Sequence, residues 1–339
     1  MKTTSVSFLF SILLLISSCS GNDGHKRVLK LAHGLPTSHS VHLGMVYMGH
    51  CLDSLSGGKM GIDIYPSGQL GSETQCIELL QIGSLDVTKV SSGAVEGFID
   101  EYKIFGIPYL FRSKAHYFAV LDGPIGEEFL HMTEPYRFIG LGYYDSGARS
   151  FYTTNRAINH PDDLRGLKIR VMRSPIAVEM MRAFGGSATP VDWGELYTAL
   201  QSSVVDGAEN NTPSVTTAFH HEVAKYYTVD EHTMLPDVMI MSTNMWSQLT
   251  GQERVWVKEA MRLSVSYQRD LWAKQEIESM NEMKEKGMQI IYPDKTPFQQ
   301  MSAPLLEKFR ADSKYTRLIE EIEAVQETVV VETVTTDSL

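Results

Sequence analysis

The chain has 339 residues, 43% of them hydrophobic and 21% charged, which is the composition of a globular protein long enough for two domains. Its formal net charge of −11 disfavours nucleic acid and anionic membrane surfaces as partners. The same charge repels small anions, so any site for an anion must be built locally from well-placed donors.

The first twenty residues, MKTTSVSFLFSILLLISSCS, carry one early lysine and an apolar run from Phe8 to Ile16. The run is too short to span a bilayer as a permanent helix and predicts the core of a secretory signal. It ends in ISSC, similar to a bacterial lipobox, which predicts a lipid-modified Cys19 after a signal peptide over 1–19. A plain signal peptide cut near the same place is the alternative. Residues 20–27 then form a polar linker, and the protein is expected to be periplasmic and anchored to a bacterial membrane through Cys19.

Cys51 and Cys76 are the two other cysteines. In an exported protein they could form a disulfide, but the sequence gives no distance between them. Both lie among helix-like apolar residues, which favours two buried free thiols.

The first half of the chain alternates strand and helix patterns. Apolar periodicity predicts strands over 28–33, 62–65 and 85–90, and helices over 41–55 and 73–82. A serine in the loop before the second helix is its expected N-cap. Strand, helix, strand, helix, strand in this order predicts a parallel α/β domain.

A second unit of the same kind begins near Gly147, with a strand at 167–171 and helices predicted over 176–184 and 193–201. Two α/β units joined by more than one crossing segment predict a hinged pair with a cleft between them. Ligands of such sheets bind in that cleft, at the carboxyl ends of the strands.

The stretch TGQE at 250–253 is a capping box that opens a helix predicted to reach residue 286. At about 1.5 Å per residue the helix is roughly 50 Å long, more than one small domain, so we expect it to run across both. The expected division is domain I over 28–147 and about 236–275, domain II over 148–235 and about 276–325, and a tail over 326–339.

The stretch RGLKIRVM raises the question of what Arg170 contacts. Leu167, Ile169 and Val171 alternate on one face of the predicted strand, and Lys168 and Arg170 fall on the other. A guanidinium cannot lose its charge, so it needs water or an anion. Because Arg170 is near the carboxyl end of its strand, it could point into the cleft; a structural salt bridge to an Asp or Glu is the alternative.

The motifs GLKIRV, ELYTALQ and VVDGAENN occur in this order, with YPSGQLGSE upstream and YYTVDEHTMLPDV downstream. Together they resemble the solute-binding proteins of tripartite ATP-independent periplasmic (TRAP) transporters, the DctP-type family, from about Val28 to Pro297. The chain is most similar to the sugar-acid branch, where GAENN and DEHT are typical together. The resemblance implies a two-domain α/β fold like that of type II periplasmic binding proteins, which closes around an organic acid. It also implies delivery of that acid to an ion-gradient-driven permease.

The resemblance carries ligand contacts onto particular residues. Arg170 matches the family's carboxylate-binding arginine, and Arg149 matches a second arginine that often assists. Asn210 matches the asparagine that fixes the main arginine or the ligand carboxylate. Trp193 takes the place of an aromatic residue packed beside the ligand, and Ser91 that of a residue at the ligand's far end. One residue more separates the two arginines than in sialate-binding members, which puts the Arg149 contact in question.

Other residues are expected near the ligand. Glu73 is the best acceptor for sugar hydroxyls, although an acid in the first turn of a helix is favourable in any case. Asp145 could bind a hydroxyl or pair with the second arginine. His33 and His39 bracket the loop HGLPTSH at a strand end, and either could touch the ligand. Met172, at the end of the strand that carries the main arginine, is counted with the same contacts.

Histidines recur at His39 and His42 and again at 220–221, but no third ligand accompanies either pair, so no metal and no cofactor are expected. Lys89 could neutralise an acid beside the cleft, although a solvated lysine is the simpler interpretation.

The residues and the resemblance together predict a lipid-anchored, monomeric binding protein for a monocarboxylate sugar acid, a hexuronate such as D-glucuronate or D-galacturonate. Its expected partners are that ligand and a TRAP permease, with no nucleic acid. A secreted sugar-acid-processing enzyme is one alternative, since Glu73 and Asp145 could form a carboxylate pair. No G-x-S-x-G, H-E-x-x-H or phosphate loop supports it. A ligand-sensing lipoprotein is the other alternative.

Overall fold

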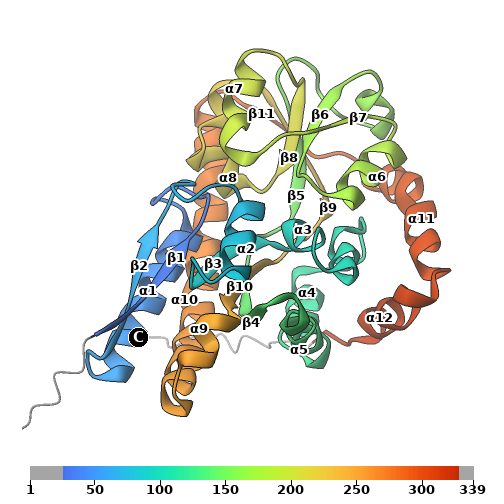
Figure 1. The fold of residues 1–339 in the computed structure, drawn as a ribbon. Helices are drawn as coiled ribbons and strands as arrows, with labels where there is room; N and C mark the ends of the chain where they lie inside the picture. Colours follow the sequence, from blue (N-terminus) through green and yellow to red (C-terminus); the bar gives the residue numbers. More distant parts are fainter. Residues whose placement is uncertain (1–25, 328–339) are drawn as a thin grey trace, which may run out of the picture.

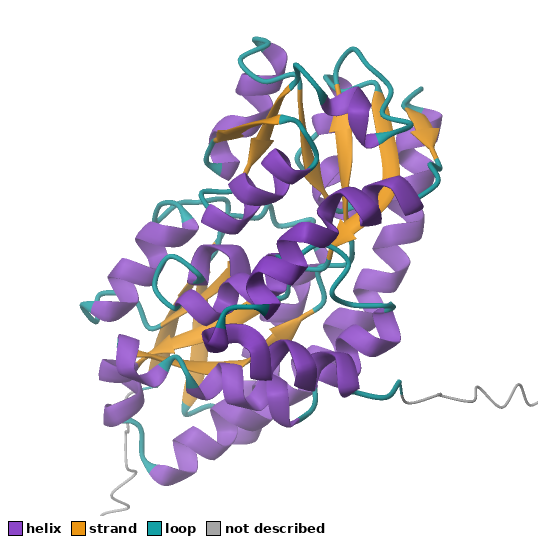
Figure 2. Cartoon of the chain, turned by 90° about the vertical axis from the view of Figure 1, so that its right-hand side faces the viewer, coloured by secondary structure: helices purple, strands orange, loops and turns teal. Residues whose placement is uncertain are grey.

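The computed structural model describes residues 26–327, so the expected signal peptide, Cys19 and most of the tail lie outside the described residues. The described chain forms two β-sheets, each covered by helices, arranged end to end (Figures 1 and 2). Between residues 26 and 327, no helix combines the length and the apolar character needed to cross a membrane.

The first sheet has the order β2-β1-β3-β10-β4. Its strands are β1 (Arg27–Ala32), β2 (Met60–Tyr65), β3 (Val87–Ser91), β4 (Phe138–Tyr144) and β10 (Asp237–Ser242). β1, β2 and β3 are parallel, as predicted, but β10 is antiparallel to both of its neighbours. The prediction of a parallel domain is therefore wrong in this part, because β10 enters the sheet from the other half of the molecule.

Both faces of this sheet are buried, which explains the unbroken apolar run in β10. Val238 and Ile240 face one hydrophobic cluster, and Met239 and Met241 face another. Helices around this sheet are α1 (Ser40–Ser56), α2 (Glu73–Gln81), α3 (Ser92–Val95), η1 (Asp100–Gly106), α4 (Lys114–Leu121), α5 (Pro124–His131), η2 (Glu134–Tyr136) and α9 (Thr243–Gln248). The predicted cap is present, since the Ser72 hydroxyl accepts from the Gln75 amide at the start of α2.

The second sheet has the order β11-β9-β5-β8-β6-β7 and is also mixed. Its strands are β5 (Arg149–Thr153), β6 (Lys168–Val171), β7 (Ser187–Pro190), β8 (Gly207–Asn210), β9 (Tyr226–Thr233) and β11 (Gln289–Ile291). β5 is antiparallel to β8 and β9, while β6 is parallel to β7 and β8. Surrounding helices are η3 (Pro161–Leu164), α6 (Pro175–Ala183), η4 (Trp193–Glu195), α7 (Leu196–Gln201), α8 (Thr212–Thr217), η5 (His220–Glu222) and α11 (Thr296–Arg310). The chain continues from α11 into α12 (Ser313–Ala324).

The chain crosses between the sheets after β4, after β9 and along α10 (Gly251–Glu285). The Thr250–Glu253 capping box starts α10 as predicted. This 35-residue helix packs on α1 and β4 of the first half and on α8 and β11 of the second, which confirms that it spans both (Figure 1). The last helix, α12, packs on α11 and returns to η1 and α5. The expected domain boundaries stay a prediction.

Cys51 and Cys76 are buried free thiols, as predicted. Cys51 belongs to the hydrophobic cluster under α1 and α10, and Cys76 to the cluster under α2. The two thiols thus lie in separate clusters.

The contact between α1 and α10 holds the first crossing segment in place. Gln268 is fully buried and its amide bonds both the N–H and the C=O of Asp145, each at 2.8 Å. A Cβ at Gly44 would lie 2.8 Å from Cβ and Cγ of Gln268. Glycine at this position therefore allows α10 close enough to α1 for Gln268 to reach the backbone of the crossing segment.

Gly44→Ala should lower the free energy of unfolding by about 1–2 kcal/mol, because crowding of a fixed side chain costs more than alanine gains in helix preference. The expected result is a thermal unfolding midpoint lowered by several degrees, measured by circular dichroism.

Gly251→Ala in the first turn of α10 is the matched control, since nothing lies within 4 Å of its Cβ position. It should leave the midpoint unchanged or raise it. Equal midpoints for the two variants would contradict the packing argument.

Candidate functional site

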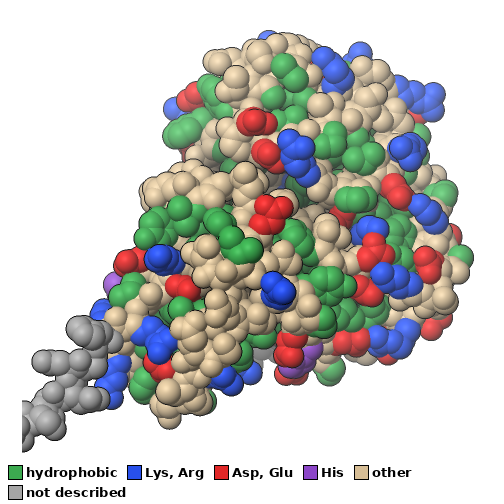
Figure 3. Space-filling view, in the orientation of Figure 1, with side chains coloured by type: hydrophobic (Ala, Val, Ile, Leu, Met, Phe, Trp, Pro, Cys, Tyr) green, Lys and Arg blue, Asp and Glu red, His purple; other side chains and the backbone are tan. Residues whose placement is uncertain are grey.

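A cavity of about 350 Å³ lies between the two sheets, at the carboxyl ends of β3 and β6. Of the residues that the sequence predicts near the ligand, all except Asp145 and His33 line this cavity. Those that line it are His39, Glu73, Ser91, Arg149, Arg170, Met172, Trp193 and Asn210. On the face of the molecule seen in Figure 3, acidic and basic side chains are interspersed, so this face shows no large patch of one sign.

Arg170 on β6 is a buried charge of the cavity without a counter-charge. Its side chain is only 3% exposed, and its Nε donates to the carbonyl of Val191 at 2.8 Å. Among the described residues no group accepts from Nη1 or Nη2, and no carboxylate lies within 4.0 Å. Burial lowers the pKa of Arg170. The alternative of a structural salt bridge is therefore wrong for the described chain, and the fork is free to bind an anion.

Trp193 forms the wall beside this arginine. The Arg170 guanidinium carbon lies 5.9 Å from the centroid of the Trp193 ring, a cation–π distance. The indole also lies near His220, at 5.0 Å between ring centroids. Burial and then the Arg170 charge lower the pKa of His220 to about 3, so its ring is neutral. Tyr152 holds His220 by a hydrogen bond of 2.8 Å between its hydroxyl and Nδ1.

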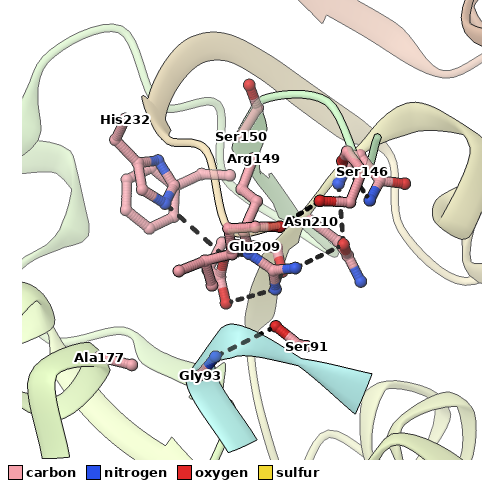
Figure 4. A network of polar contacts seen from close by, with 12 residues as sticks. Ser91, Gly93, Ser146, Arg149, Ser150, Ala177, Glu209, Asn210 and His232 are labelled. Atoms are coloured by element: carbon pink, nitrogen blue, oxygen red, sulfur yellow. Dashed lines mark hydrogen bonds and ion pairs between the residues drawn. The ribbon is translucent and has the colours of Figure 1, made fainter. Parts of the chain in front are cut away.

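Arg149 also lines the cavity, but its charge is already paired. Its Nη2 donates to the Glu209 carboxylate and to the Glu209 carbonyl, each at 2.9 Å, and its Nε donates to the other carboxylate oxygen (Figure 4). Its Nη1 donates to Oδ1 of Asn210 at 2.8 Å. Glu209 was not predicted from the sequence, although an acid inside the short strand GAEN indicates a buried ion pair.

Asn210 presents its amide nitrogen to the cavity. Its Oδ1 accepts from Arg149 and from the backbone N–H of Asn211 at 2.9 Å, which assigns the amide orientation. In the described structure Nδ2 has no acceptor. Asn210 therefore gives the cavity that Arg170 also lines a donor, while its Oδ1 holds Arg149.

His232 supports the Arg149–Glu209 pair from behind (Figure 4). Its Nδ1 lies 2.7 Å from the Asp230 carboxylate, and its Nε2 lies 3.7 Å from that of Glu209. Burial acts to lower the pKa of His232, but Asp230 and Glu209 outweigh it and raise the pKa to about 9. Burial acts to raise the pKa of Glu209, but Arg149 and His232 lower it to about 2. At neutral pH Arg149, Glu209 and His232 are therefore charged.

The opposite wall carries Lys89 between two acids. Its Nζ donates to Glu73 Oε1 at 3.2 Å and to Asp237 Oδ1 at 3.1 Å, and the side chain is almost fully buried. The interpretation of Lys89 as a solvated lysine is wrong, because β3 is covered on both faces. Glu73 Oε1 also accepts from the Ser91 N–H at 3.1 Å, so Glu73 does more than favour the helix start. The Ser91 hydroxyl accepts from Gly93.

Asp145 and His33 do not line the cavity. Asp145 pairs with Lys114 at 3.0 Å and accepts from the Gly147 N–H at 2.8 Å, so it neither pairs with Arg149 nor faces Glu73 across the site. His33 is held by His42, at 3.0 Å between ring nitrogens, and accepts from a backbone N–H. Neighbours nearer in space hold both side chains away from the cavity wall, and contact of either residue with a ligand stays a prediction.

His39 does line the cavity and joins its two walls. Nδ1 accepts from the Val41 N–H at 3.2 Å, so Nε2 carries the proton and donates to the Ser214 hydroxyl at 3.3 Å on α8. Burial and then the nearby Lys89 lower the pKa of His39 to about 3, so the ring is neutral.

Residues 31–312 match the family described as bacterial extracellular solute-binding protein, family 7. The chain is 37% identical over 317 residues to an uncharacterised protein of Salmonella typhimurium, YiiZ, a match that covers 93% of this chain and 96% of the relative.

Two solved structures are similar over nearly their whole length. A TRAP periplasmic solute-binding protein from Xanthobacter autotrophicus with bound β-D-galacturonate gives a TM-score of 0.85 at 40% identity, covering 88% of this chain and 100% of that one. One from Pseudomonas putida with bound D-glucuronate gives 0.86 at 35% identity, covering 89% and 98%. The two-sheet architecture is thus that of TRAP periplasmic binding proteins.

The raised pKa of His232 makes stability depend on pH. Its charged form is stabilised in the folded state, so this contribution is complete below pH 6.5 and is lost as pH rises to about 9. His232→Gln should therefore flatten the fall in unfolding midpoint between pH 6.5 and 9 by several degrees, as measured by thermal unfolding.

The substitution also removes a contact of Glu209, whose pKa of about 2 lies far below this pH range, so the difference between the two slopes from pH 6.5 to 9 reports His232. His131→Gln, at an exposed histidine, is the control and should keep the wild-type slope. Parallel curves for wild type and His232→Gln would contradict the assignment.

Proposed function

The chain belongs to family 7 of the bacterial extracellular solute-binding proteins, and on that basis we propose that it binds a monocarboxylate sugar acid, a hexuronate such as D-galacturonate or D-glucuronate. It is a solute-binding protein of the TRAP type and not an enzyme. The ligand class rests on the relatives with bound galacturonate and glucuronate and on the chemistry of the cavity.

The unpaired guanidinium of Arg170 is the observation that carries this proposal. A guanidinium fork matches a carboxylate in a bidentate arrangement, and such charge-assisted hydrogen bonds are short and strong. The Nδ2 group of Asn210 donates to the same carboxylate, and the Trp193 ring packs on the apolar face of the sugar. Arg149, already neutralised by Glu209, positions Asn210 and shapes the site.

Ligand hydroxyls face the other wall. Glu73 and Asp237 accept hydrogen bonds there, and Ser91 lies beside them. Because the two walls belong to different sheets, a ligand that contacts both stabilises the closed arrangement over an open one. We infer a hinge at the crossing segments after β4 and β9, between domains with the boundaries expected from the sequence. This cleft closure presents the loaded protein to the permease.

For placement in the cell, we propose a monomer tethered to the membrane by a lipid on Cys19, in keeping with the periplasmic location of the family. Mass spectrometry of the mature N-terminus decides between a lipoprotein signal and a plain signal peptide. An acylated Cys19 supports the tether, and an unmodified N-terminus near this position contradicts it.

Arg170→Gln should weaken hexuronate binding by about 30- to 5,000-fold, because it leaves a buried carboxylate without its charged partner. Glutamine keeps a planar amide against Trp193, so the loss reports charge rather than packing. Arg170→Lys keeps the charge without the fork and should give an intermediate loss. Isothermal titration with D-galacturonate and D-glucuronate measures both.

Lys168→Met is the matched control, since it removes a cation from the exposed end of the same strand. It should leave the affinity within about twofold of wild type, as surface changes normally do. Unchanged affinity in Arg170→Gln, or no binding of either hexuronate to the wild-type protein, would overturn the proposed function.

A further inference from the structure

The two walls of the cavity differ in net charge. On the wall formed by the second sheet, Arg149 is balanced by Glu209, and Arg170 has no carboxylate partner. On the wall formed by the first sheet, one lysine, Lys89, lies between two carboxylates, those of Glu73 and Asp237. Arg173 and Asp192 also line the second wall and pair with each other at 2.7 Å. Apart from the exposed Glu195, the second wall therefore carries one unbalanced positive charge, and the first wall carries one unbalanced negative charge.

The acidic wall is held rigidly by backbone pairing. Asp237 lies opposite Ser91 in the β3–β10 ladder, and Lys89 lies opposite Met239, so Asp237 and Lys89 are diagonal neighbours. Glu73 begins α2 and is fixed by two donors, Lys89 and the Ser91 N–H. Lys89 thus acts as a clamp that keeps two carboxylates together at the surface of the cavity.

One oxygen of each clamped carboxylate has no donor. Lys89 and Ser91 bond Oε1 of Glu73, and Lys89 bonds Oδ1 of Asp237. Among the described residues no donor reaches Oε2 of Glu73 or Oδ2 of Asp237, although both side chains line the cavity. Ionised carboxylates only accept hydrogen bonds, so this wall is satisfied by hydroxyl donors of a ligand.

A second carboxylate on the ligand could not supply the donors that this wall needs. It has no hydrogen to donate at neutral pH, and it would lie against two acids that share one lysine. Like charges brought together in a desolvated site cost several kcal/mol, which corresponds to about 100-fold or more in affinity.

We propose that Glu73 and Asp237, clamped by Lys89, restrict the site to monocarboxylates by excluding aldarates, the sugar diacids formed when C1 of a hexuronate is oxidised to a carboxylate. Arg170 receives the carboxylate at one end, and the clamped acids require a hydroxyl at the other. This inference rests on the proposed hexuronate binding, and it names the residues that restrict the ligands to monocarboxylates. Glu73 and Asp237 are specificity-determining residues.

Isothermal titration at neutral pH tests this with two ligand pairs, D-galacturonate with galactarate and D-glucuronate with D-glucarate. Within each pair the molecules share the configuration at C2–C5, but the aldarate has a carboxylate at C1 and is open-chain, whereas the hexuronate is a pyranose. The change of the ratio in the charge-removing variants therefore separates the effect of the second charge from that of the ring. For the wild-type protein, the aldarate of the better-bound pair should bind at least about 100-fold more weakly than the hexuronate. Glu73→Gln and Asp237→Asn each remove one negative charge. Each should lower the ratio of the aldarate Kd to the hexuronate Kd by about tenfold or more.

Glu78→Gln is the matched control, because it makes the same change on the exposed face of the same helix, α2. It should keep the wild-type ratio. Thermal unfolding of each variant checks that it is folded, and the two charge-removing variants test the clamp independently of each other.

A wild-type protein that binds an aldarate as tightly as its hexuronate would overturn the inference and leave the proposed function intact. The same holds if the ratio is unchanged in both Glu73→Gln and Asp237→Asn. If neither hexuronate binds to the wild-type protein, the proposed function fails first and the inference falls with it.

Discussion

A buried guanidinium without a carboxylate partner is unfavourable in a folded protein, and Arg170 is such a group. Its backbone bond to Val191 and its contact with the Trp193 ring offset only part of the lost hydration. In the proposed function a ligand carboxylate supplies what is missing, and the binding free energy then includes relief of a cost that the unliganded protein already bears. The rest of the site can be understood as the set of constraints that preserve this one unpaired charge.

The first constraint is that no neighbouring acid neutralises Arg170. Glu209 is the acid that would do so, but Arg149 and His232 hold its carboxylate on both oxygens. Asp230 in turn balances the charge on His232. On the far wall, Lys89 holds Glu73 and Asp237 against the first sheet in the same way. Each of these acids is held by a cationic partner other than Arg170. The cavity therefore keeps an unpaired positive charge on one wall and an excess negative charge on the other.

Local signals in the sequence predicted much of the fold. A capping box and an N-cap serine mark the starts of α10 and α2, because these motifs bond atoms only a few residues apart. The antiparallel pairing of β10 could not be predicted from such local motifs, because it depends on a return of the chain from the second sheet.

The residues of the candidate site also differ in whether local sequence patterns could predict them. Alternation in one short strand was enough to single out Arg170, and the family resemblance brought Asn210 and Trp193 to the same cavity. The partners of Lys89 and Arg149 were missed because the contacts that matter join residues up to 148 positions apart. Charged residues inside short, buried strands were the available signal: Lys89, Arg149 and Glu209 are each paired there, and Arg170 is the exception.

The most direct test of the account is the affinity of the wild-type protein for a hexuronate compared with its methyl ester and its parent hexose, measured by isothermal titration. The ester keeps the shape and every ring hydroxyl but removes the negative charge that Arg170 is expected to meet. We predict binding of the acid and a loss of at least about 30-fold for the ester and the hexose. Equal affinity for the acid and its ester would show that the unpaired guanidinium does not receive the ligand carboxylate, and would contradict the central claim.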